Sequence, residues 1–445
     1  MAFPSAAVAL PGRSLLTFLC LAAVGCGGSD QVAAARWRTV TDTIGDTIVV
    51  RTVGARDSAA LLTLVPEVQI GQLDGPDEYT FGGVGTLEAA PQGGVYVWDD
   101  VVKALRLYDD GGTFVRQIGR RGGGPGEYQE ANDLAVLPDA RLVLWDPRNA
   151  RINVYDSAGT AVDSWHVANG LFVGGRGLWV DTAGSVYMLG WNRPPGEGDD
   201  APKDVLLRLD RAGRIVDTLR PPLPDVPDAT LVASGEGIRS FQTVPYMPSA
   251  QWEFTREGDF VTGRGDRYAL TVHRRGVPLL RIEREVPPVA VQPDEADDAR
   301  EYVIGRLRRA DPSWRWNGPS IPETKPFFTG ITVDADGRLW VRRSEPGERI
   351  PEAELAELRE EAARRPIRPP LPPPRAWREP VAYDVFAPDG EFLGHLPVPP
   401  RTSLLYMSGS TVWATVRDSL DVPTVTRFRV EPAAGLRDVG QGFAP

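Results

Sequence analysis

A repeated pattern of two short strands joined by a tight turn is the feature that most limits how this chain can fold. Five segments of eleven residues align without gaps. Each is an apolar strand, a turn rich in Pro, Asp or Gly, and a second strand rich in β-branched and aromatic residues. The copies begin at Leu87, Leu134, Leu178, Trp252, Ile331 and, in a shorter form, Leu404. Each copy predicts a β-hairpin. Because one hairpin cannot bury its own apolar face, the copies must stack on one another.

A second hairpin follows most copies, for example over residues 106–115 and 153–162. Equivalent residues of the first two copies, such as Trp98 and Trp145, are 47 residues apart. Four strands in about 45 to 50 residues form one blade of a β-propeller. The sequence therefore predicts an all-β fold, a six-bladed β-propeller of four-stranded antiparallel blades. Seven blades are the alternative, because segment 225–275 matches the pattern least.

The last copy supplies only three strands, so another segment must close the ring. Two loops, 75–79 and 124–128, are nearly the same in sequence. The second loop belongs between the outer strand of one blade and the inner strand of the next, and the first should have the same place. Val65–Gln72 is then the missing outer strand. Joining the first and last segments in one blade removes the free sheet edges.

One stretch, QIGRRGGGPGEYQEANDLAVLPDARLVLWDPRNARINVYDSAGTAV, resembles an NHL-type repeat and a group of bacterial six-bladed propeller lipoproteins. Residues 321–326, Ile-Pro-Glu-Thr-Lys-Pro, lead into ITVDADGRLWVR and resemble that group too. The resemblance is strong over 65–167, moderate over 320–395 and weak over 220–285. It implies the propeller fold and names no ligand.

The first 25 residues have the pattern of a signal peptide. Arg13 supplies a positive charge, and Ser14 to Val24 form an uncharged run too short to span a bilayer. The small residues before Cys26 resemble a bacterial lipobox, which implies that Cys26 is acylated and becomes the mature N-terminus. Ala23 stands where that pattern usually has Leu, and an ordinary signal peptide is the alternative. We expect an exported protein, lipid-anchored to the outer membrane or the periplasmic face of the cell envelope.

Beyond the signal peptide, we expect one large domain with short helical insertions. The expected order is a lipid-anchored linker at 26–36, the propeller at 37–434 with insertions at 286–326 and 344–380, and a tail at 435–445. Acids precede bases in Pro293–Arg309, which suits a helix and its dipole. A second helix is expected over Pro351–Arg365, followed by an extended, proline-rich segment at 366–374. A solvated excursion, a docking arm and a lid over the channel all remain open for 344–380.

Composition excludes several classes of function. The net charge is −11 and no basic cluster appears, so we expect no nucleic-acid partner. No cysteine follows Cys26, so the folded part has no disulfide, zinc–cysteine site or cysteine nucleophile. His166 and His395 should lie on outer strands and His273 on a third strand, far from one another. We assign no catalytic residue, cofactor or metal motif, although a divalent cation bound by carboxylates remains open.

Several tempting features have simpler structural explanations. The turn Asp334–Gly337 lacks the length and closing Glu of a calcium loop, so a β-turn is expected. Large residues in second strands, such as Trp98, Trp145 and Trp340, should pack between blades. Trp314 and Trp316 lie in an irregular segment, where they could contact a partner or anchor the insertion.

Propellers usually bind ligands where the inner strands open onto the central channel. The candidate contacts just before the inner strands are Asn132, Asp133, Arg176, Gln251 and Thr329. The carboxylates there are few: Asp133 and Glu88. The glycine-rich run Gly119–Gly126 suits turn geometry, with anion capture by Arg120, Arg121 and the loop amides as the alternative.

These observations favour a monomeric binding or scaffold protein of the cell envelope, whose ligand is a protein, a peptide or a carbohydrate. Its contact with the membrane would be through the lipid anchor only. One alternative is a propeller hydrolase, lactonase or lyase at the channel mouth, which rests on fold analogy. Another is a sensor or assembly subunit that docks through 344–380.

Overall fold

The structure of the chain is a computed structural model. It describes residues 37–433 except 55–61, 168–176, 192–203, 227–228, 236–237 and 365–370. Among these residues, no helix is both long and apolar enough to cross a membrane.

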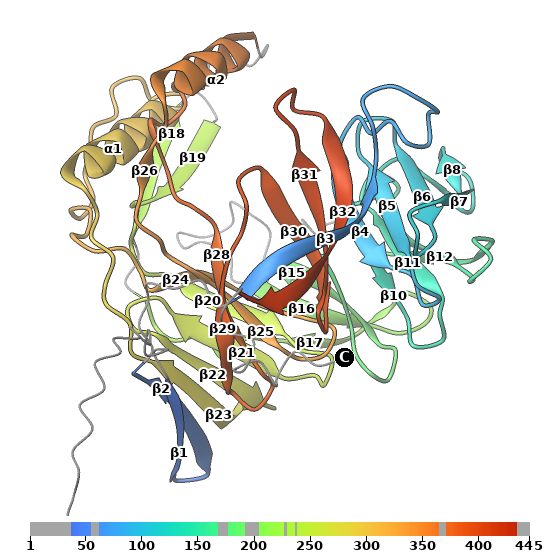
Figure 1. Cartoon of the computed structure of the whole chain (residues 1–445), viewed down its shortest axis with the longest axis horizontal. Helices are drawn as coiled ribbons and strands as arrows, with labels where there is room; N and C mark the ends of the chain where they lie inside the picture. The colour runs from blue at the N-terminus through green and yellow to red at the C-terminus, as the bar shows by residue number, and fades with distance from the viewer. Residues whose placement is uncertain are drawn as a thin grey trace, which may run out of the picture. The chain divides into compact units, whose positions relative to one another are not determined.

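Six antiparallel sheets form the blades (Figure 1). Blade 1 contains β4 (Val84–Ala89), β5 (Val95–Asp99), β6 (Ala104–Tyr108) and β7 (Phe114–Ile118). Blade 2 contains β10 (Asp133–Val136), β11 (Leu142–Asp146), β12 (Arg151–Tyr155) and β13 (Ala161–His166). Blade 3 contains β14 (Leu178–Val180), β15 (Val186–Trp191), β16 (Asp204–Leu209) and β17 (Ile215–Leu219).

The second half of the chain continues the pattern. Blade 4 contains β20 (Ala250–Phe254), β21 (Phe260–Arg264), β22 (Ala269–Arg274) and β23 (Val277–Arg284). Blade 5 contains β24 (Phe328–Val333), β25 (Leu339–Arg343), β28 (Ala382–Phe386) and β29 (Phe392–Pro397). Blade 6 contains β30 (Thr402–Ser408), β31 (Thr411–Arg417), β32 (Pro423–Pro432) and β3 (Leu62–Ile70). The prediction of six four-stranded blades is therefore confirmed.

Strand β3 closes the ring, as the sequence predicts for Val65–Gln72. It pairs antiparallel with β32, with Leu64 opposite Val430 and Ile70 opposite Val425. Ile70 is 1% exposed and packs in one apolar cluster with residues of blades 1 and 6, among them Tyr108 and Trp413. A strand from the N-terminal part of the chain and the last described strand are thus held in one blade.

The inner strands β4, β10, β14, β20, β24 and β30 run in the same direction around a central channel. The amide of Thr182, in the turn after β14, donates to the carbonyl of Arg256, in the turn after β20. The amide of Ala335, after β24, donates likewise to Met407 near the end of β30. Such contacts join equivalent ends of neighbouring strands. We call the end with these short turns the turn end of the channel, and the end where each inner strand begins the loop end.

Large side chains fill the space between blades, as expected. Trp98, Trp145 and Trp340 are 1%, 3% and 0% exposed, respectively. Trp98 packs edge-on against Tyr128 of the neighbouring segment, with ring centroids 5.2 Å apart. Aromatic pairs of this geometry add to the stability gained by burying their area.

Blade 4 carries an extra hairpin to which the sequence analysis gave no place. It consists of β1 (Arg38–Ile44) and β2 (Thr47–Val53). Strand β2 pairs parallel with the outer strand β23, with Ile48 opposite Leu280. The blade 4 sheet therefore has six strands.

Three segments of the chain leave the blades at the loop end and form what we call the cap, residues 221–249, 286–326 and 344–381. Its elements are β18 (Thr230–Gly235), β19 (Ile238–Thr243), α1 (Pro293–Leu307), β26 (Glu348–Arg349), α2 (Glu352–Arg364) and β27 (Trp377–Arg378). Figure 1 shows α1, α2, β18 and β19 gathered on one side. Both helices occur where the sequence predicts them. Of the proline-rich segment 366–374, residues 366–370 lie outside the described part, and 371–374 form neither helix nor strand.

Helix α1 begins where local chemistry dictates. Gln292 and Glu295 form a reciprocal capping box, and Pro293 occupies the first turn. Its apolar side packs on the β18–β19 hairpin, where Val303, Leu307 and Trp314 are buried. The indole N–H of Trp314 donates to the carbonyl of Val232 at 3.0 Å, and that of Trp316 to Gly318 at 3.1 Å. Both tryptophans thus anchor the insertion.

Candidate functional site

The inner strands enclose a channel with a cavity of about 490 Å³. Cavities of roughly 300–1,000 Å³ accommodate small organic ligands. Its wall includes the aromatic and aliphatic side chains of Trp179, Phe254, Tyr383, Leu405 and Tyr406. The charged side chains of the lining are Glu88, Asp133, Arg256 and Asp334. What the channel can do depends on how these four are held.

Asp133 joins blade 2 to blade 3. Its Oδ2 accepts hydrogen bonds from the amides of Gly177 and Leu178, both at 2.9 Å. Its Oδ1 accepts one from the amide of Leu134, also at 2.9 Å. The carboxylate therefore satisfies backbone donors at the start of β14, which is a structural task.

Asp334 organises the turn after β24. Its Oδ1 accepts the amides of Asp336 and Arg338, both at 2.9 Å, and its Oδ2 accepts the indole N–H of Trp340 at 3.1 Å. Burial raises the pKa of this carboxyl, against the opposing effect of these hydrogen bonds. The expected β-turn is confirmed, and the carboxylate of its first residue, Asp334, accepts hydrogen bonds from the backbone of the same turn.

Glu88 and Arg256 are the other two charges, and both lie toward the turn end. Glu88 is next to last in β4, and Arg256 is in the turn after β20. Tyr406, near the end of β30, lies within the electrostatic range of both. Burial, and after it the charge of Glu88, raises the pKa of Tyr406 to about 12, while Arg256 opposes the shift. The turn end of the channel thus combines a carboxylate, a guanidinium and a phenol.

The residues proposed at the loop end are only partly brought together. Asn132 and Asp133 line the channel, whereas Gln251 and Thr329 do not. The side-chain amide of Gln251 donates to the hydroxyl of Ser249 at 2.7 Å. The pairing register of β24 with β25 shifts between Phe328 and Gly330. The exposed Thr329 therefore lies at an irregularity in the hydrogen-bond ladder between these two strands. Arg176, and the lipidation candidate Cys26, lie outside the described residues.

Sequence reasoning noted Glu88 but missed Arg256 and Tyr406. Arg256 occupies a turn position where the other copies have Pro91, Pro138 or Ala335, so the repeat itself carries the signal. At this one position of the turn, Arg256 is the only charged residue among the six copies, and it faces the channel because its turn abuts the turn of the preceding blade.

The donors of the glycine-rich run bind a carboxylate of the protein itself, that of Glu127. It contains the parallel pair β8 (Arg120–Arg121) and β9 (Glu127–Tyr128). A guanidinium nitrogen of Arg120 lies 2.7 Å from Glu127 Oε1, and the amide of Gly124 donates to Glu127 Oε2 at 2.7 Å. The Gly124 amide and then Arg120 lower the pKa of Glu127. The groups suggested for anion capture therefore bind Glu127, while Arg121 is exposed.

The histidines lie on the strands expected: His166 on β13, His395 on β29 and His273 on β22. His395 Nδ1 is 2.8 Å from Asp384 Oδ1. Within the described ranges, no three His, Cys, Asp or Glu side chains gather as metal ligands would.

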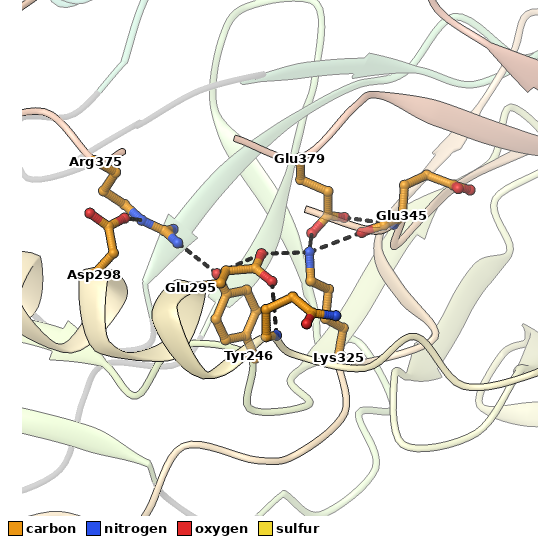
Figure 2. A network of polar contacts seen from close by, with 8 residues as sticks. Tyr246, Glu295, Asp298, Lys325, Glu345, Arg375 and Glu379 are labelled. Carbon is orange, nitrogen blue, oxygen red and sulfur yellow. Dashed lines mark hydrogen bonds and ion pairs between the residues drawn. The ribbon is translucent and has the colours of Figure 1, made fainter. Parts of the chain in front are cut away.

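A second cluster of titratable groups lies within the cap (Figure 2). Its centre is Lys325, whose side chain is 0% exposed. The ammonium lies 2.8 Å from both Glu295 Oε1 and Glu379 Oε2, and it donates to the carbonyl of Glu345 at 2.9 Å. Glu295 comes from α1, and Glu379 from the segment that returns to β28. Lys325 itself is the lysine of the 321–326 motif noted in the sequence.

Tyr246 and Arg375 extend this cluster to the remaining insertion. The hydroxyl of Tyr246 donates to Glu295 Oε1 at 3.1 Å and accepts from Arg375 at 2.6 Å. Arg375 also binds Asp298 of α1, at 3.3 Å. Burial raises the pKa of Tyr246 to about 12, although Arg375 opposes the shift. Every charge here has an opposite partner, so the cluster joins the three parts of the cap to one another.

Comparison with known proteins addresses the fold. Residues 61–167 match the model of the family DUF5128, described as a 6-bladed beta-propeller. The protein is a six-bladed β-propeller. No curated protein sequence matches the chain.

Solved structures are similar to this propeller over most of its length. A member of the duf4221 family from Bacteroides vulgatus is 12% identical, with a TM-score of 0.49 over 84% of this chain and 99% of that one. A gluconolactonase from Xanthomonas campestris is 16% identical, with a TM-score of 0.36 over 85% and 100%. A virginiamycin B lyase from Staphylococcus aureus is 10% identical, with a TM-score of 0.36 over 83% and 99%. At these identities the likeness concerns fold alone.

Proposed function

We propose that this propeller is a non-enzymatic binding protein of the bacterial cell envelope, anchored by a lipid on Cys26, that holds a small ligand in its central channel. The channel carries the proposal, because it combines a ligand-sized cavity of about 490 Å³ with an aromatic wall and few charged groups. The lipobox-like sequence before Cys26 supports the anchor.

The way the channel holds its acids supports binding over catalysis. General acid–base chemistry needs a group that can exchange a proton with a substrate at hydrogen-bond distance. Asp133 and Asp334 instead accept backbone amides through hydrogen bonds of 2.9 Å. Both residues are also at most 7% exposed. Their carboxylates shape the channel and hold its strands together.

The ligand site can be tested with a variant that fills the channel. Thr332 lies on β24 between Ile331 and Val333, which are buried between the blades, and it lines the cavity. Thr332→Trp should fill that space. Thr329→Trp is the matched control, because Thr329 is exposed and does not line the cavity. We expect the wild type and the control to retain the same compounds from a small-molecule envelope extract, read by mass spectrometry, and Thr332→Trp to lose them. Equal retention by all three proteins contradicts a channel site.

The anchor can be tested in the full chain expressed in bacteria and labelled with a radioactive fatty acid. Wild-type protein should carry the label and sediment with membranes, and Cys26→Ser should do neither. Cys20→Ser is the matched control, because Cys20 is the only other cysteine of the sequence. Label on Cys26→Ser at the wild-type level contradicts the anchor.

A further inference from the structure

We infer that the channel ligand is an uncharged carbohydrate, a short sugar whose hydroxyl groups bind the free edges of the inner strands and whose C–H groups lie against the aromatic side chains of the wall. This inference rests on the proposed function, in which the channel is the ligand site. It assigns a chemical class to that ligand.

The first step concerns the acids of the channel, which the protein itself already uses. Asp133 accepts backbone amides through both of its oxygens, and Asp334 accepts two amides and the indole N–H of Trp340. Both acids are at most 7% exposed. Glu88 likewise interacts within the protein. An ammonium group on a ligand would therefore meet acids that already have partners, and a charge that is desolvated without a partner is costly.

The second step concerns a ligand of negative charge. The described lining carries one guanidinium, that of Arg256, against the acidic side chains of Glu88, Asp133 and Asp334. Like charges repel more strongly in a partly desolvated channel than in bulk water, so an anion is disfavoured. The N–H groups of Arg256 are also hydrogen-bond donors to uncharged oxygen atoms. The charges of the lining thus favour a neutral ligand with hydroxyl groups.

The third step concerns the backbone that faces the channel. Each inner strand is the end member of its sheet, and residues of all six line the cavity: β4, β10, β14, β20, β24 and β30. In the described sheets, one side of each inner strand therefore has N–H and C=O groups without a strand partner. A ligand that displaces water from these groups must replace the lost hydrogen bonds. Hydroxyl groups both donate and accept, so a sugar matches either kind of group, whereas a wholly apolar ligand matches neither.

The fourth step concerns the aromatic part of the wall. Trp179, Phe254 and Tyr406 line the cavity. The indole N–H of Trp179 donates to Glu253, and its ring stacks on Trp252 with ring centroids 5.8 Å apart. These contacts fix the ring before a ligand enters, which lowers the entropy cost of binding. A sugar ring presents C–H groups on its faces, and burial of these apolar groups against an aromatic side chain favours binding.

The test compares neutral sugars with small aromatic ions. Isothermal titration calorimetry with the mature protein uses D-glucose, D-galactose, D-mannose, N-acetyl-D-glucosamine, maltose and cellobiose. The charged comparators are benzylamine, benzoate and L-phenylalanine. We expect at least one sugar to bind, and every comparator to bind about tenfold more weakly than that sugar or worse, because its charge stays without a partner. No binding of any sugar, or a comparator that binds as tightly as the best sugar, overturns the inference.

A hydroxyl of the lining can be assigned with Thr332→Val, which removes the Thr332 hydroxyl from the cavity wall. It should weaken binding of the sugar about threefold to tenfold, the effect of one hydrogen bond. Thr271→Val is the matched control, because Thr271 is also half-buried and lies on β22, outside the lining. It should bind the sugar like the wild type.

The aromatic contact can be assigned with Tyr406→Leu, which should weaken binding about tenfold. Tyr302→Leu is the matched control, because Tyr302 is half-buried on α1 and does not line the cavity. The same titrations give the fraction of protein that binds, so partial unfolding lowers the stoichiometry and does not imitate a weaker affinity. Unchanged affinity in both Thr332→Val and Tyr406→Leu overturns the inference.

The failure of this inference is distinguishable from failure of the proposed function. If Thr332→Trp loses compounds that the wild type retains, the channel is a ligand site whatever those compounds are. Should those compounds be amino acids, other ions or wholly apolar molecules, the channel site stands and the carbohydrate assignment is wrong. Equal retention by the wild type and Thr332→Trp contradicts the channel site itself.

Discussion

Aspartates in the turns of this propeller carry out a recurring structural task. Asp109, Asp156 and Asp210 begin the turns between the third and outer strands of blades 1 to 3. Each accepts, through Oδ1, the amides two and four residues later, at distances between 2.8 and 3.0 Å. Such side-chain hydrogen bonds favour turns over continued strands. Part of the chain's acidity is therefore turn chemistry.

Lys325 shows what one buried charge contributes. Lys325→Met would leave Glu295, whose side chain is 2% exposed, and Glu379 without their shared counter-charge. Loss of one partner from a buried ion pair costs about 3–5 kcal/mol. We expect a loss of that order in the free energy of unfolding, measured with urea.

Lys103→Met makes the same chemical change at a half-buried position of the β5–β6 turn. It should change the free energy of unfolding by less than about 0.5 kcal/mol, as surface substitutions usually do. Equal effects of the two substitutions would mean that the cluster around Lys325 contributes no more than a surface site.

Asp384 couples the stability of the blade 4–blade 5 interface to pH. Burial alone would raise the pKa of this carboxyl, but the hydrogen bond from His395 and the charge of Arg284 outweigh it, and the folded pKa lies below its ordinary value of 3.8. A lowered folded pKa means that the unfolded chain takes up the proton first. The contribution of the Asp384 carboxylate to the free energy of unfolding is therefore complete above about pH 3.8. It is lost as the pH falls through the pKa that this carboxyl has in the folded state.

Asp384→Asn removes the charge at every pH. Urea unfolding from pH 7 to pH 3 should show that the variant is less stable than the wild type at neutral pH. The difference between their free energies of unfolding should narrow below about pH 3.8. A constant difference between the two free energies of unfolding over this pH range would show that Asp384 is not the titrating group.

The sequence predicted residue positions wherever strand alternation sets them. The three histidines and the buried tryptophans fall on the expected strands, because a side chain's face follows from its register. Arg256 and Tyr406 were missed as site residues. Whether a turn side chain meets the channel depends on how neighbouring turns contact one another, and no local pattern records that.

Helices and strands were easier to predict from the sequence when their hydrogen-bond partners lie nearby in the chain. The strands of each inner hairpin are neighbours in sequence, and each helix forms its backbone hydrogen bonds within its own segment, so local patterns reveal them. The β1–β2 hairpin escaped because β2 pairs in parallel with β23, more than two hundred residues away. The β18–β19 hairpin was absorbed into the least certain blade, because its apolar residues pack against α1.

Trp314 tests whether the cap unfolds as a unit of its own. It is 5% exposed in the apolar cluster between α1 and the β18–β19 hairpin. Trp314→Ala removes a large buried side chain, a change that costs about 3–5 kcal/mol. Hydrogen exchange should then accelerate in 293–310 and 229–247 and remain slow in the strands of blades 1 and 2.

Trp316→Ala is the matched control for the cap. Its ring is half-buried, and its indole binds carbonyls of Gly318 and Pro319, next to it in the chain. Its effect on exchange should be smaller and confined to nearby residues. If Trp314→Ala accelerates exchange in every blade alike, the cap and the propeller unfold together.

For the molecule as a whole, closure through β3 is what turns six blades into one cooperative structure. Blade 6 takes its outer strand from residues more than three hundred positions before its other three. Without β3, the edge of β32 would be open, and open edges favour pairing between chains. By contrast, β1 and β2 extend a blade that already has four strands.

Two truncations separate these roles. A chain that begins at residue 54 lacks β1 and β2 but keeps β3, and it should remain a monomer with a single unfolding transition. It should be less stable than the chain that begins at residue 37, because the truncation removes the buried side chains of Val49 and Val50, which are 1% and 4% exposed. A chain that begins at residue 73 also lacks β3, and it should associate or unfold at a much lower urea concentration. Light scattering and urea unfolding measure both effects. If the two truncated chains behave alike, closure through β3 is not what holds the ring together.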